Sequence, residues 1–240
     1  MMLKGKVALV TGSAKRTGKY IALALAKQGA DVVIHFNKSK KEAGNVVHEI
    51  RAMGRRSVAI KADLRNPKEA EILMDKITII FGRVDILVNN VGNFLVKDIT
   101  KLETDEWNHL IDTTLNSTFY CCKYALPYMA KQKYGRIINI ADSGADYIKP
   151  WPRITPYMIG KTGILILTKT LAEAYAKHGI TVNAISPGVM ENAVVKPIER
   201  MPMGRYANYE DITNAILFLL KNESNYVTGT NLKVSGGYNT

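Results

Sequence analysis

The chain has 240 residues, 47% of them hydrophobic and 22% charged, and Lys and Arg exceed Asp and Glu by 33 to 21, a net charge of +12. This size and composition predict one globular domain spanning residues 1–240. No apolar run reaches the roughly 18 residues of a membrane helix, and the first strand begins too early to leave room for a signal peptide. The two adjacent cysteines, Cys121 and Cys122, exclude a disulfide framework and a zinc site, so we expect a cytoplasmic protein without a metal centre.

Strand-like and helix-like segments alternate along the chain. Short aliphatic runs at 7–10, 32–36, 57–61, 86–89, 135–140, 181–185 and 231–234 are typical of parallel strands covered on both faces. Helical patterns lie at 19–28, 42–53, 68–81, 105–131, 156–177 and 209–220. The alternation predicts an α/β fold: a single doubly wound, Rossmann-type domain with a parallel sheet of about seven strands flanked by helices.

Polar or glycine residues follow five of the expected strands. They are Thr11-Gly12, Asp63, Asn89-Asn90, Asp142-Ser143 and Ser186-Pro187-Gly188. Each of these taken alone is typical of a turn. In a doubly wound sheet, however, ligands bind beyond the carboxyl ends of the strands, so five such ends along one edge predict a binding site there.

The first strand leads into a turn that contains two glycines, Gly12 and Gly18, with Lys15, Arg16 and Thr17 between them. Gly12 permits a tight turn, and Gly18 permits a helix to pack closely on the sheet. The N-terminus of the helix that follows offers free N–H groups to a phosphate. The turn therefore predicts a site for the pyrophosphate of a dinucleotide.

Tyr157 and Lys161 stand one helical turn apart, so both side chains lie on the same helix face. A nearby ammonium favours phenolate, and we expect it to lower the pKa of Tyr157 from about 10 towards neutrality. Such a pair is common on helices and is by itself weak evidence. Together with the glycine turn, it indicates proton transfer beside a bound dinucleotide.

The preferred coenzyme is argued from charge at the end of the second strand. An NAD enzyme needs an acid there for the ribose 2′-hydroxyl, but no carboxylate lies between Asp31 and Glu42. The place is taken by Asn37, Lys38 and Ser39. Cations and hydroxyls suit a 2′-phosphate, which favours NADP(H), although the lysines also fit a solvated helix start.

The motifs together resemble the short-chain dehydrogenase/reductase superfamily along the whole chain. They include Thr11-Gly12 with Gly18, Asn89-Asn90-Val91-Gly92, Tyr157 with Lys161, Ser186-Pro187-Gly188 and Tyr226-Val227-Thr228-Gly229. The resemblance implies that Tyr157 is the general acid, that Lys161 holds the nicotinamide ribose, and that the protein is a homotetramer. It implies these coenzyme-binding residues: Gly12, Lys15, Arg16, Thr17, Gly18, Asn37, Lys38, Ser39, Asp63, Leu64, Asn90, Gly92, Tyr157, Lys161, Pro187, Gly188 and Val189.

Two positions depart from the family pattern. Asp142 stands where the family has the serine that orients the substrate, and Ser143 follows it, so either residue is a candidate for that role. Thr114 occupies the position of a family asparagine, while Asn116 points roughly 200° away around the helix.

These departures resemble the pteridine reductase branch. That branch has arginine in the glycine turn, as Arg16, an aspartate as Asp142, and a phenylalanine that stacks on the pterin, as Phe94. We therefore expect an NADPH-dependent reductase that transfers hydride to a small C=O or C=N substrate in a pteridine-reductase-like site.

Two alternatives stay open. The first is a 3-oxoacyl-(acyl-carrier-protein) reductase, whose acidic carrier protein would be attracted by the basic residues Lys131, Lys133, Lys177 and His178. The second is a non-catalytic nucleotide-binding or nucleic-acid-binding protein, since the net charge is positive. The basic residues are scattered, however, and a binding protein does not need the pair of Tyr157 and Lys161.

Overall fold

Seven parallel strands form one sheet in the computed structural model, which describes residues 1–239. The strands are β1 (Val7–Val10), β2 (Asp31–Phe36), β3 (Ser57–Lys61), β4 (Ile86–Asn89), β5 (Gly135–Ile140), β6 (Ile180–Pro187) and β7 (Asn231–Val234). Their order across the sheet is β3-β2-β1-β4-β5-β6-β7. This arrangement confirms the predicted fold class; that residues 1–240 make up one domain stays a prediction.

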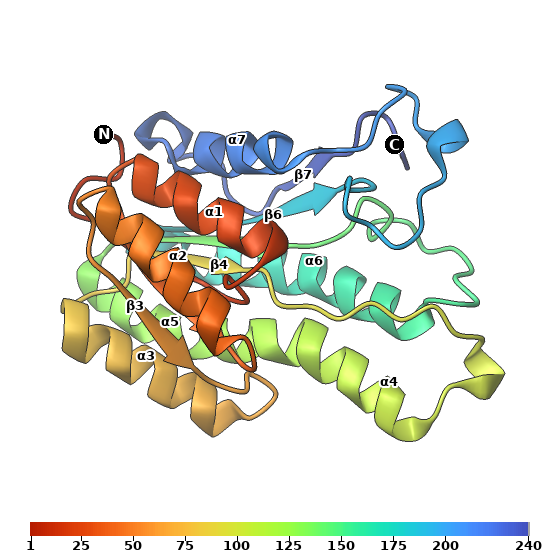
Figure 1. Cartoon of the computed structure of the whole chain (residues 1–240), viewed down its shortest axis with the longest axis horizontal. Helices are drawn as coiled ribbons and strands as arrows, with labels where there is room; N and C mark the ends of the chain where they lie inside the picture. The colour runs from red at the N-terminus through yellow and green to blue at the C-terminus, as the bar shows by residue number, and fades with distance from the viewer. Residues whose placement is uncertain (240) are drawn as a thin grey trace.

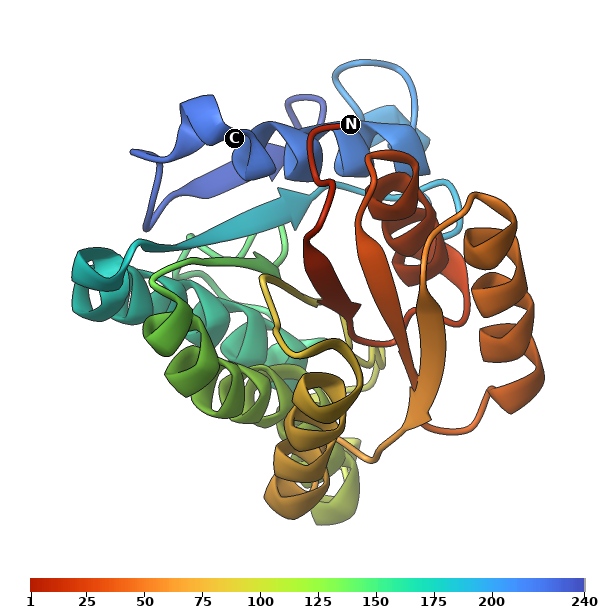
Figure 2. The same ribbon diagram turned by 90° about the vertical axis from the view of Figure 1, so that its left-hand side faces the viewer.

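Helices cover both faces of the sheet. They are α1 (Arg16–Lys27), α2 (Lys40–Ala52), α3 (Pro67–Phe81), α4 (Thr104–Ile111), α5 (Ser117–Gln132), α6 (Thr155–Tyr175) and α7 (Tyr209–Leu220). Helices α1, α2 and α7 pack on one face, and α3, α5 and α6 on the other (Figures 1 and 2). Because alternate side chains of a strand point to opposite faces, Ala8 and Val10 join one apolar cluster while Val7 and Leu9 join the other.

The segment expected as one helix at 105–131 is interrupted. Between α4 and α5 lies a π-helical turn, Asp112–Asn116. Around it, hydroxyl groups bond to carbonyl oxygens four residues earlier: Thr113 Oγ1 donates to the His109 carbonyl (2.6 Å) and Ser117 Oγ to the Thr113 carbonyl (2.8 Å). Such bonds compete with the helical N–H groups and loosen the regular pattern, which the apolar periodicity does not reveal.

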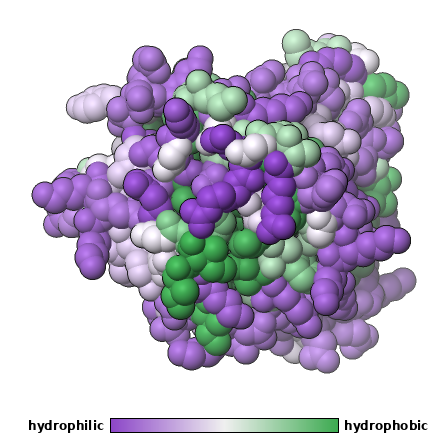
Figure 3. All heavy atoms as spheres, turned by 60° about the vertical axis from the view of Figure 1, so that its left-hand side comes forward, coloured by the Kyte–Doolittle hydropathy of each residue, from purple (hydrophilic) through white to green (hydrophobic). Residues whose placement is uncertain are grey.

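Because all seven strands are parallel, their carboxyl ends lie along the same edge of the sheet; β6 points to the right in Figure 1. The segments 90–103, 141–154 and 188–208 gather there. Among residues 1–239, no helix combines the length and the apolar character needed to cross a bilayer. The face drawn in Figure 3 is mostly hydrophilic, with apolar residues gathered mainly in one patch.

Candidate active site

The glycine turn is locked to the end of β2 by His35. Gly12 adopts a positive φ of 62°, and its N–H donates to His35 Nδ1 (2.9 Å). Nε2 of the same ring lies 3.0 Å from the Ala62 carbonyl oxygen, so the geometry requires a neutral ring with its proton on Nε2. Burial lowers the pKa of His35 to about 4, which keeps the ring neutral. This role was not predicted, because a histidine inside a strand carries no turn signal.

Gly18 is required by close packing rather than by its backbone angles. A Cβ at this position would overlap the Gly12 carbonyl oxygen and lie 2.9 Å from Ser13 Cα. On the other side of the turn, Asn90 Nδ2 donates to the Thr11 carbonyl oxygen (2.9 Å), and Thr11 Oγ1 accepts from the Asn90 N–H (2.9 Å). The turn is thereby held between β2 and β4.

Helix α1 presents its N-terminus to a cleft with a volume of about 840 Å³, called the larger cleft below. Its first turn carries no acidic residue, and no side chain caps its N–H groups. The residues of the turn that line the cleft are Gly12, Lys15, Arg16, Thr17 and Gly18. Free N–H groups and the positive end of a helix dipole fit the pyrophosphate of a dinucleotide.

A second cleft of about 390 Å³ lies beside β2 and β3. It is lined by the residues at the ends of β2 and β3 that were predicted to bind the coenzyme: Asn37, Lys38, Ser39, Asp63 and Leu64. Arg65 Nε donates to Asp63 Oδ1 (3.0 Å), and these hydrogen bonds lower the pKa of Asp63 to about 2. Arg65 also lies 3.2 Å from His109 Nδ1; neither residue was predicted, because each comes from a segment without a motif.

The charges near the end of β2, where a 2′-phosphate was expected, differ in one respect from those that the sequence suggests. Glu42, the first carboxylate after β2, reaches back to form an ion pair with Lys15 (2.7 Å). Lys15 is therefore partly neutralised, whereas Lys38 has no ion-pair partner within residues 1–239. This contact could not be predicted from the sequence pattern, because Glu42 and the glycine turn are far apart along the chain.

Tyr157 and Lys161 both line the larger cleft, as the spacing predicted. Tyr157 OH donates to Asp142 Oδ2 (3.2 Å). Lys161 Nζ donates to the Ile140 carbonyl oxygen (2.5 Å) and lies 5.6 Å from the centroid of the Tyr157 ring. Helix α6 thus presents both side chains to the end of β5.

The prediction of a lowered phenol pKa is wrong for this geometry. Burial, with a smaller effect of the Asp142 carboxylate, raises the pKa of Tyr157 well above its usual value. The Asp142 carboxylate adds to the effect of burial because it accepts the hydrogen bond of the phenol, whereas Lys161 Nζ donates to the Ile140 carbonyl oxygen. Burial lowers the pKa of Lys161 to about 8.

Of the two candidates for substrate orientation, Asp142 is the one that contacts Tyr157. Its other oxygen, Oδ1, accepts from the Gly144 N–H (2.9 Å), which fixes the carboxylate. Ser143 is buried, and its N–H donates to the Pro187 carbonyl oxygen (3.1 Å). Both residues line the cleft.

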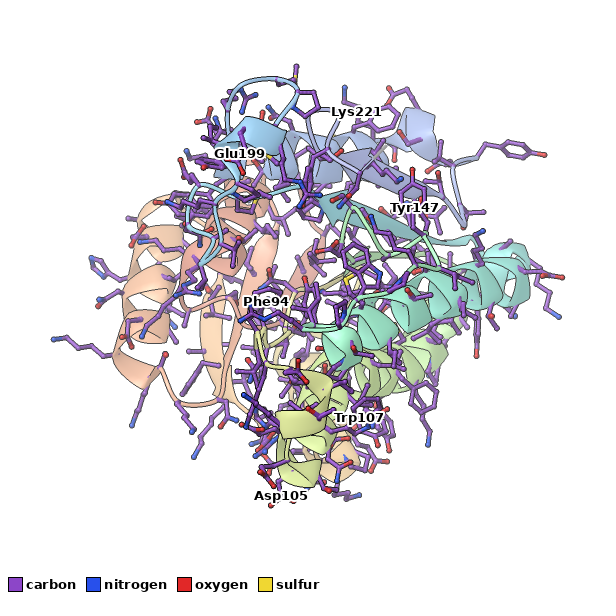
Figure 4. All side chains as sticks on the ribbon, turned by 90° about the vertical axis from the view of Figure 1, so that its right-hand side faces the viewer. Phe94, Asp105, Trp107, Tyr147, Glu199 and Lys221 are labelled. Carbon is purple, nitrogen blue, oxygen red and sulfur yellow. The ribbon has the colours of Figure 1, made fainter. Side chains whose placement is uncertain are left out.

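Phe94 is not a core residue. Its side chain is 46% exposed, and its ring meets that of Tyr157 edge to face at a centroid distance of 5.0 Å. Figure 4 shows Phe94 between the segment that carries Glu199 and helix α4, which carries Trp107. The side chain of Phe94 is therefore placed to contact a molecule bound in the cleft next to the phenol of Tyr157.

Thr114 faces the site through the π-helical turn. Its Oγ1 is buried and has no hydrogen-bond partner, and both this atom and Lys161 Nζ lie within 4 Å of the place where a Cβ of Gly92 would be. Asn116 instead donates to Asp112 Oδ1 (2.7 Å), so it lies away from the site, as expected.

The end of β6 contributes to the lining of the larger cleft. Pro187, Gly188 and Val189 line it together with Asn90 and Gly92 from the end of β4, and that they bind the coenzyme stays a prediction. A Cβ on Gly188 would lie 2.8 Å from Ser235 Cα, so this position needs glycine. Every predicted coenzyme-binding residue thus borders one of the two clefts.

Comparisons with known proteins identify the family of the chain. The family model for "Enoyl-(Acyl carrier protein) reductase" matches residues 12–239. A 3-oxoacyl-[acyl-carrier-protein] reductase of Staphylococcus epidermidis is 37% identical over 243 residues, covering 97% of this chain and 98% of that protein. A 3beta-hydroxysteroid dehydrogenase of Eggerthella lenta is 36% identical, covering 98% and 94%.

Among solved structures, a short-chain dehydrogenase of Burkholderia cenocepacia in complex with NADP superimposes with a TM-score of 0.93 at 30% identity, covering all of both chains. These relatives give more support to the first alternative, a 3-oxoacyl reductase, than to a pteridine-reductase-like enzyme. They give none to a non-catalytic binding protein. The chain belongs to the short-chain dehydrogenase/reductase superfamily of oxidoreductases.

Proposed function

We propose that the protein is an NADPH-dependent reductase of 3-oxoacyl thioesters bound to an acidic carrier protein. The substrate class rests on the similarity to the Staphylococcus epidermidis reductase over nearly the whole chain. One observation carries the direction of the reaction: the hydroxyl of Tyr157 faces the cleft and is bonded to Asp142, which favours the protonated phenol. The hydroxyl therefore has a proton to donate at neutral pH, and reduction of a carbonyl needs such a donor. Because the raised pKa makes the phenol a weaker acid, the transfer depends on the positive charge of Lys161, which lies 5.6 Å from the ring centroid.

When bound, a nicotinamide coenzyme supplies the hydride that adds to the carbonyl carbon. Tyr157 donates its proton to the carbonyl oxygen as charge develops there, and regains a proton from solvent. Asp142 holds the phenol in position through the 3.2 Å hydrogen bond. Lys161, buried below the phenol, supplies a positive charge that offsets the phenolate left after proton transfer.

A preference for NADPH over NADH has two supports. No carboxylate follows directly on β2, and the cations Lys38 and Arg16 border the clefts at this end without ion-pair partners among the described residues. The Burkholderia cenocepacia enzyme was solved with NADP. A guanidinium or ammonium beside a 2′-phosphate forms charge-assisted hydrogen bonds that the 2′-hydroxyl of NADH does not offer.

A second candidate is reduction of a C=N bond in a flat heterocycle such as a dihydropterin. The observation in its favour is the carboxylate of Asp142 against Tyr157, with the ring of Phe94 beside both. A carboxylate suits proton delivery to a ring nitrogen, and an aromatic side chain suits stacking.

The test is NADPH consumption with a 3-oxobutyryl thioester of acyl carrier protein and with a dihydropterin, by the wild type and by Asp142→Ser. We expect the thioester to be the better substrate of the wild type. If only the pterin is reduced, and Asp142→Ser abolishes that activity while creating ketone reduction, the second candidate replaces the first.

We further propose a cytoplasmic homotetramer built through α5 and α6. Exposed apolar side chains on these helices support the assembly: Ile159 and Ile166 on α6 are 45% and 63% exposed, and Phe119 on α5 is 43% exposed. A patch of exposed apolar side chains usually marks a surface that another protein chain covers. Sedimentation equilibrium distinguishes the tetramer from a monomer of 26.6 kDa.

A further inference from the structure

The ionisable side chains that line the larger cleft are mostly basic. Among the described residues that line it, Asp142 is the only carboxylate, whereas five side chains are basic: Lys15, Arg16, Arg153, Lys161 and Arg200. Lys15 is paired with Glu42, Arg16 belongs to the glycine turn, and Lys161 lies below Tyr157. Arg153 and Arg200 therefore have no role in the chemistry proposed above.

Arg153 is held in place by its backbone while its side chain stays available. Its carbonyl oxygen accepts from the Lys97 N–H (2.8 Å), and it precedes α6, the helix that carries Tyr157. The guanidinium is exposed and forms no hydrogen bond or ion pair within residues 1–239. Asp98, whose pKa is lowered chiefly by Thr100 and to a smaller extent by Arg153, already accepts from the Thr100 N–H (3.0 Å) and hydroxyl (2.8 Å).

Arg200 lies at the end of the 3₁₀ turn Ile198–Arg200. Its guanidinium lies 5.5 Å from the centroid of the Tyr238 ring, which itself lines the cleft. Stacking of this kind leaves the N–H edges of the guanidinium free to bind an anion. Arg200 lines the larger cleft together with Val194, Val195 and Pro197 from the same segment.

Apolar side chains line the substrate part of the cleft together with the two arginines. They are Phe94, Val96, Trp151, Met190, Val194 and Val195. This part of the cleft is apolar, has two guanidinium groups without ion-pair partners among the described residues, and has Asp142 as its one carboxylate. It therefore fits a substrate whose reacting end is uncharged and whose far end is an anion. Arginine prefers phosphate because its fork of N–H donors matches the phosphate oxygens.

We propose that Arg153 and Arg200 form an anion site in the substrate part of the cleft, and that this site binds the phosphate at the end of a pantetheine arm. The inference rests on the proposed function, since it takes the substrate to be a thioester. A carrier protein and coenzyme A both provide this phosphate, and the experiment separates them.

Binding is measured first, without turnover. Phosphopantetheine and pantetheine, which differ only in the phosphate, are titrated calorimetrically into the enzyme saturated with NADP⁺. We expect phosphopantetheine to bind about ten- to a hundredfold more tightly. Arg153→Gln and Arg200→Gln should each remove most of this difference, whereas Lys27→Gln, which removes an equal charge at the far end of α1, should keep it.

Kinetics then identify the source of the phosphate. The kcat/KM for 3-oxobutyryl pantetheine is compared with that for 3-oxobutyryl phosphopantetheine, coenzyme A and carrier protein. The preference for phosphorylated substrates should fall by about tenfold or more in Arg153→Gln and Arg200→Gln, through KM rather than kcat. A preference for the carrier protein over coenzyme A identifies the protein-bound arm as the ligand, and the reverse identifies the free thioester.

Failures of the two proposals are distinguishable. If no thioester is reduced but phosphopantetheine still binds through Arg153 and Arg200, the anion site stands and the proposed function does not. If thioesters are reduced with equal efficiency whether or not they carry phosphate, or if both arginine variants behave like Lys27→Gln, the anion site is overturned.

Discussion

The proposed coenzyme end and the proposed substrate end of the cleft are built in different ways. At the coenzyme end, buried polar groups from separate strands bind one another: Thr11 with Asn90, and Gly12 and Ser13 with His35. At the substrate end, the lining comes from surface segments whose side chains reach into solvent, such as Phe94, 46% exposed, and Val194, 83% exposed.

This difference separates chemistry from specificity. The coenzyme end is held by hydrogen bonds that the sheet itself fixes, so its geometry follows from the fold. The loops at the substrate end have few such constraints, and their side chains are free to change with the substrate. Changes at the first end should therefore affect stability and coenzyme binding, and changes at the second end should affect the choice of substrate.

The largest effect is expected from Tyr157→Phe, which removes the proposed acid and keeps the ring. The kcat for NADPH-dependent reduction should fall by about 10³-fold, because a positioned acid contributes roughly 10²–10⁴-fold. Coenzyme affinity, measured by NADPH fluorescence, should stay within a few-fold of the wild type. The matched control is Tyr147→Phe, an exposed tyrosine outside the cleft lining; equal losses in the two variants would contradict the assignment.

His35 should make the coenzyme end sensitive to acid. Its pKa is lowered by burial from 6.5 to about 4, so between these values the unfolded chain binds the proton more tightly than the folded one. Stability should therefore be full above pH 6.5 and fall by about 3 kcal/mol as the pH drops to 4. Urea unfolding at pH 7.0, 5.5 and 4.5 measures this.

His35→Gln should show less dependence on pH in the same window, whereas His48→Gln, an exposed histidine on α2, should behave like the wild type. If all three proteins lose the same stability between pH 6.5 and 4.5, protonation of His35 is not the cause of the loss of stability in acid.

Gly18→Ala tests the packing of the turn. The added methyl group overlaps the Gly12 carbonyl oxygen, so we expect a loss of about 1–3 kcal/mol in the free energy of unfolding and weaker NADPH binding. Gly44→Ala on α2 meets nothing within 4 Å and should stabilise by roughly 0.5–1 kcal/mol, as alanine does in a helix. If the free energy of unfolding changes in the same direction in both variants, the steric argument is refuted.

Lys161 gives a prediction about the rate at high pH. Its pKa is lowered by burial to about 8, so it carries its charge below that pH and loses it above. The kcat/KM for reduction should fall by about tenfold per pH unit above pH 8. A profile that stays flat to pH 9.5 would show that the charge of Lys161 is not needed.

The smallest effect is expected from Glu42→Gln. Losing the carboxylate frees Lys15 from its 2.7 Å ion pair, and affinity for NADPH should rise by about two- to fivefold. Affinity for NADH, which lacks the 2′-phosphate, should change less. Fluorescence titration with both coenzymes measures the ratio, and an unchanged ratio would place Lys15 away from the phosphate.

Much of the coenzyme end could be predicted from the sequence, because glycines, strand ends and the pair of Tyr157 and Lys161 have fixed spacings along the chain. What could not be predicted depends on contacts across space. Glu42 reaches Lys15, His35 binds the turn, and Asp142 touches the phenol more closely than Lys161 does. Burial, together with this last contact, reversed the expected pKa of Tyr157. Spacing on a helix shows which side chains share a face, but neither how deeply they are buried nor which atom is nearest.

The claim that Asp142 and burial favour the protonated form of Tyr157 is tested most directly by its ultraviolet titration. The absorbance of tyrosinate is recorded from pH 7 to 9, with NADPH bound, for the wild type and for Tyr157→Phe. The difference between the two proteins should stay flat, because the pKa of Tyr157 lies well above 10. A rise in that difference with a midpoint inside this range would show that the ammonium of Lys161 controls the phenol, and would contradict the account.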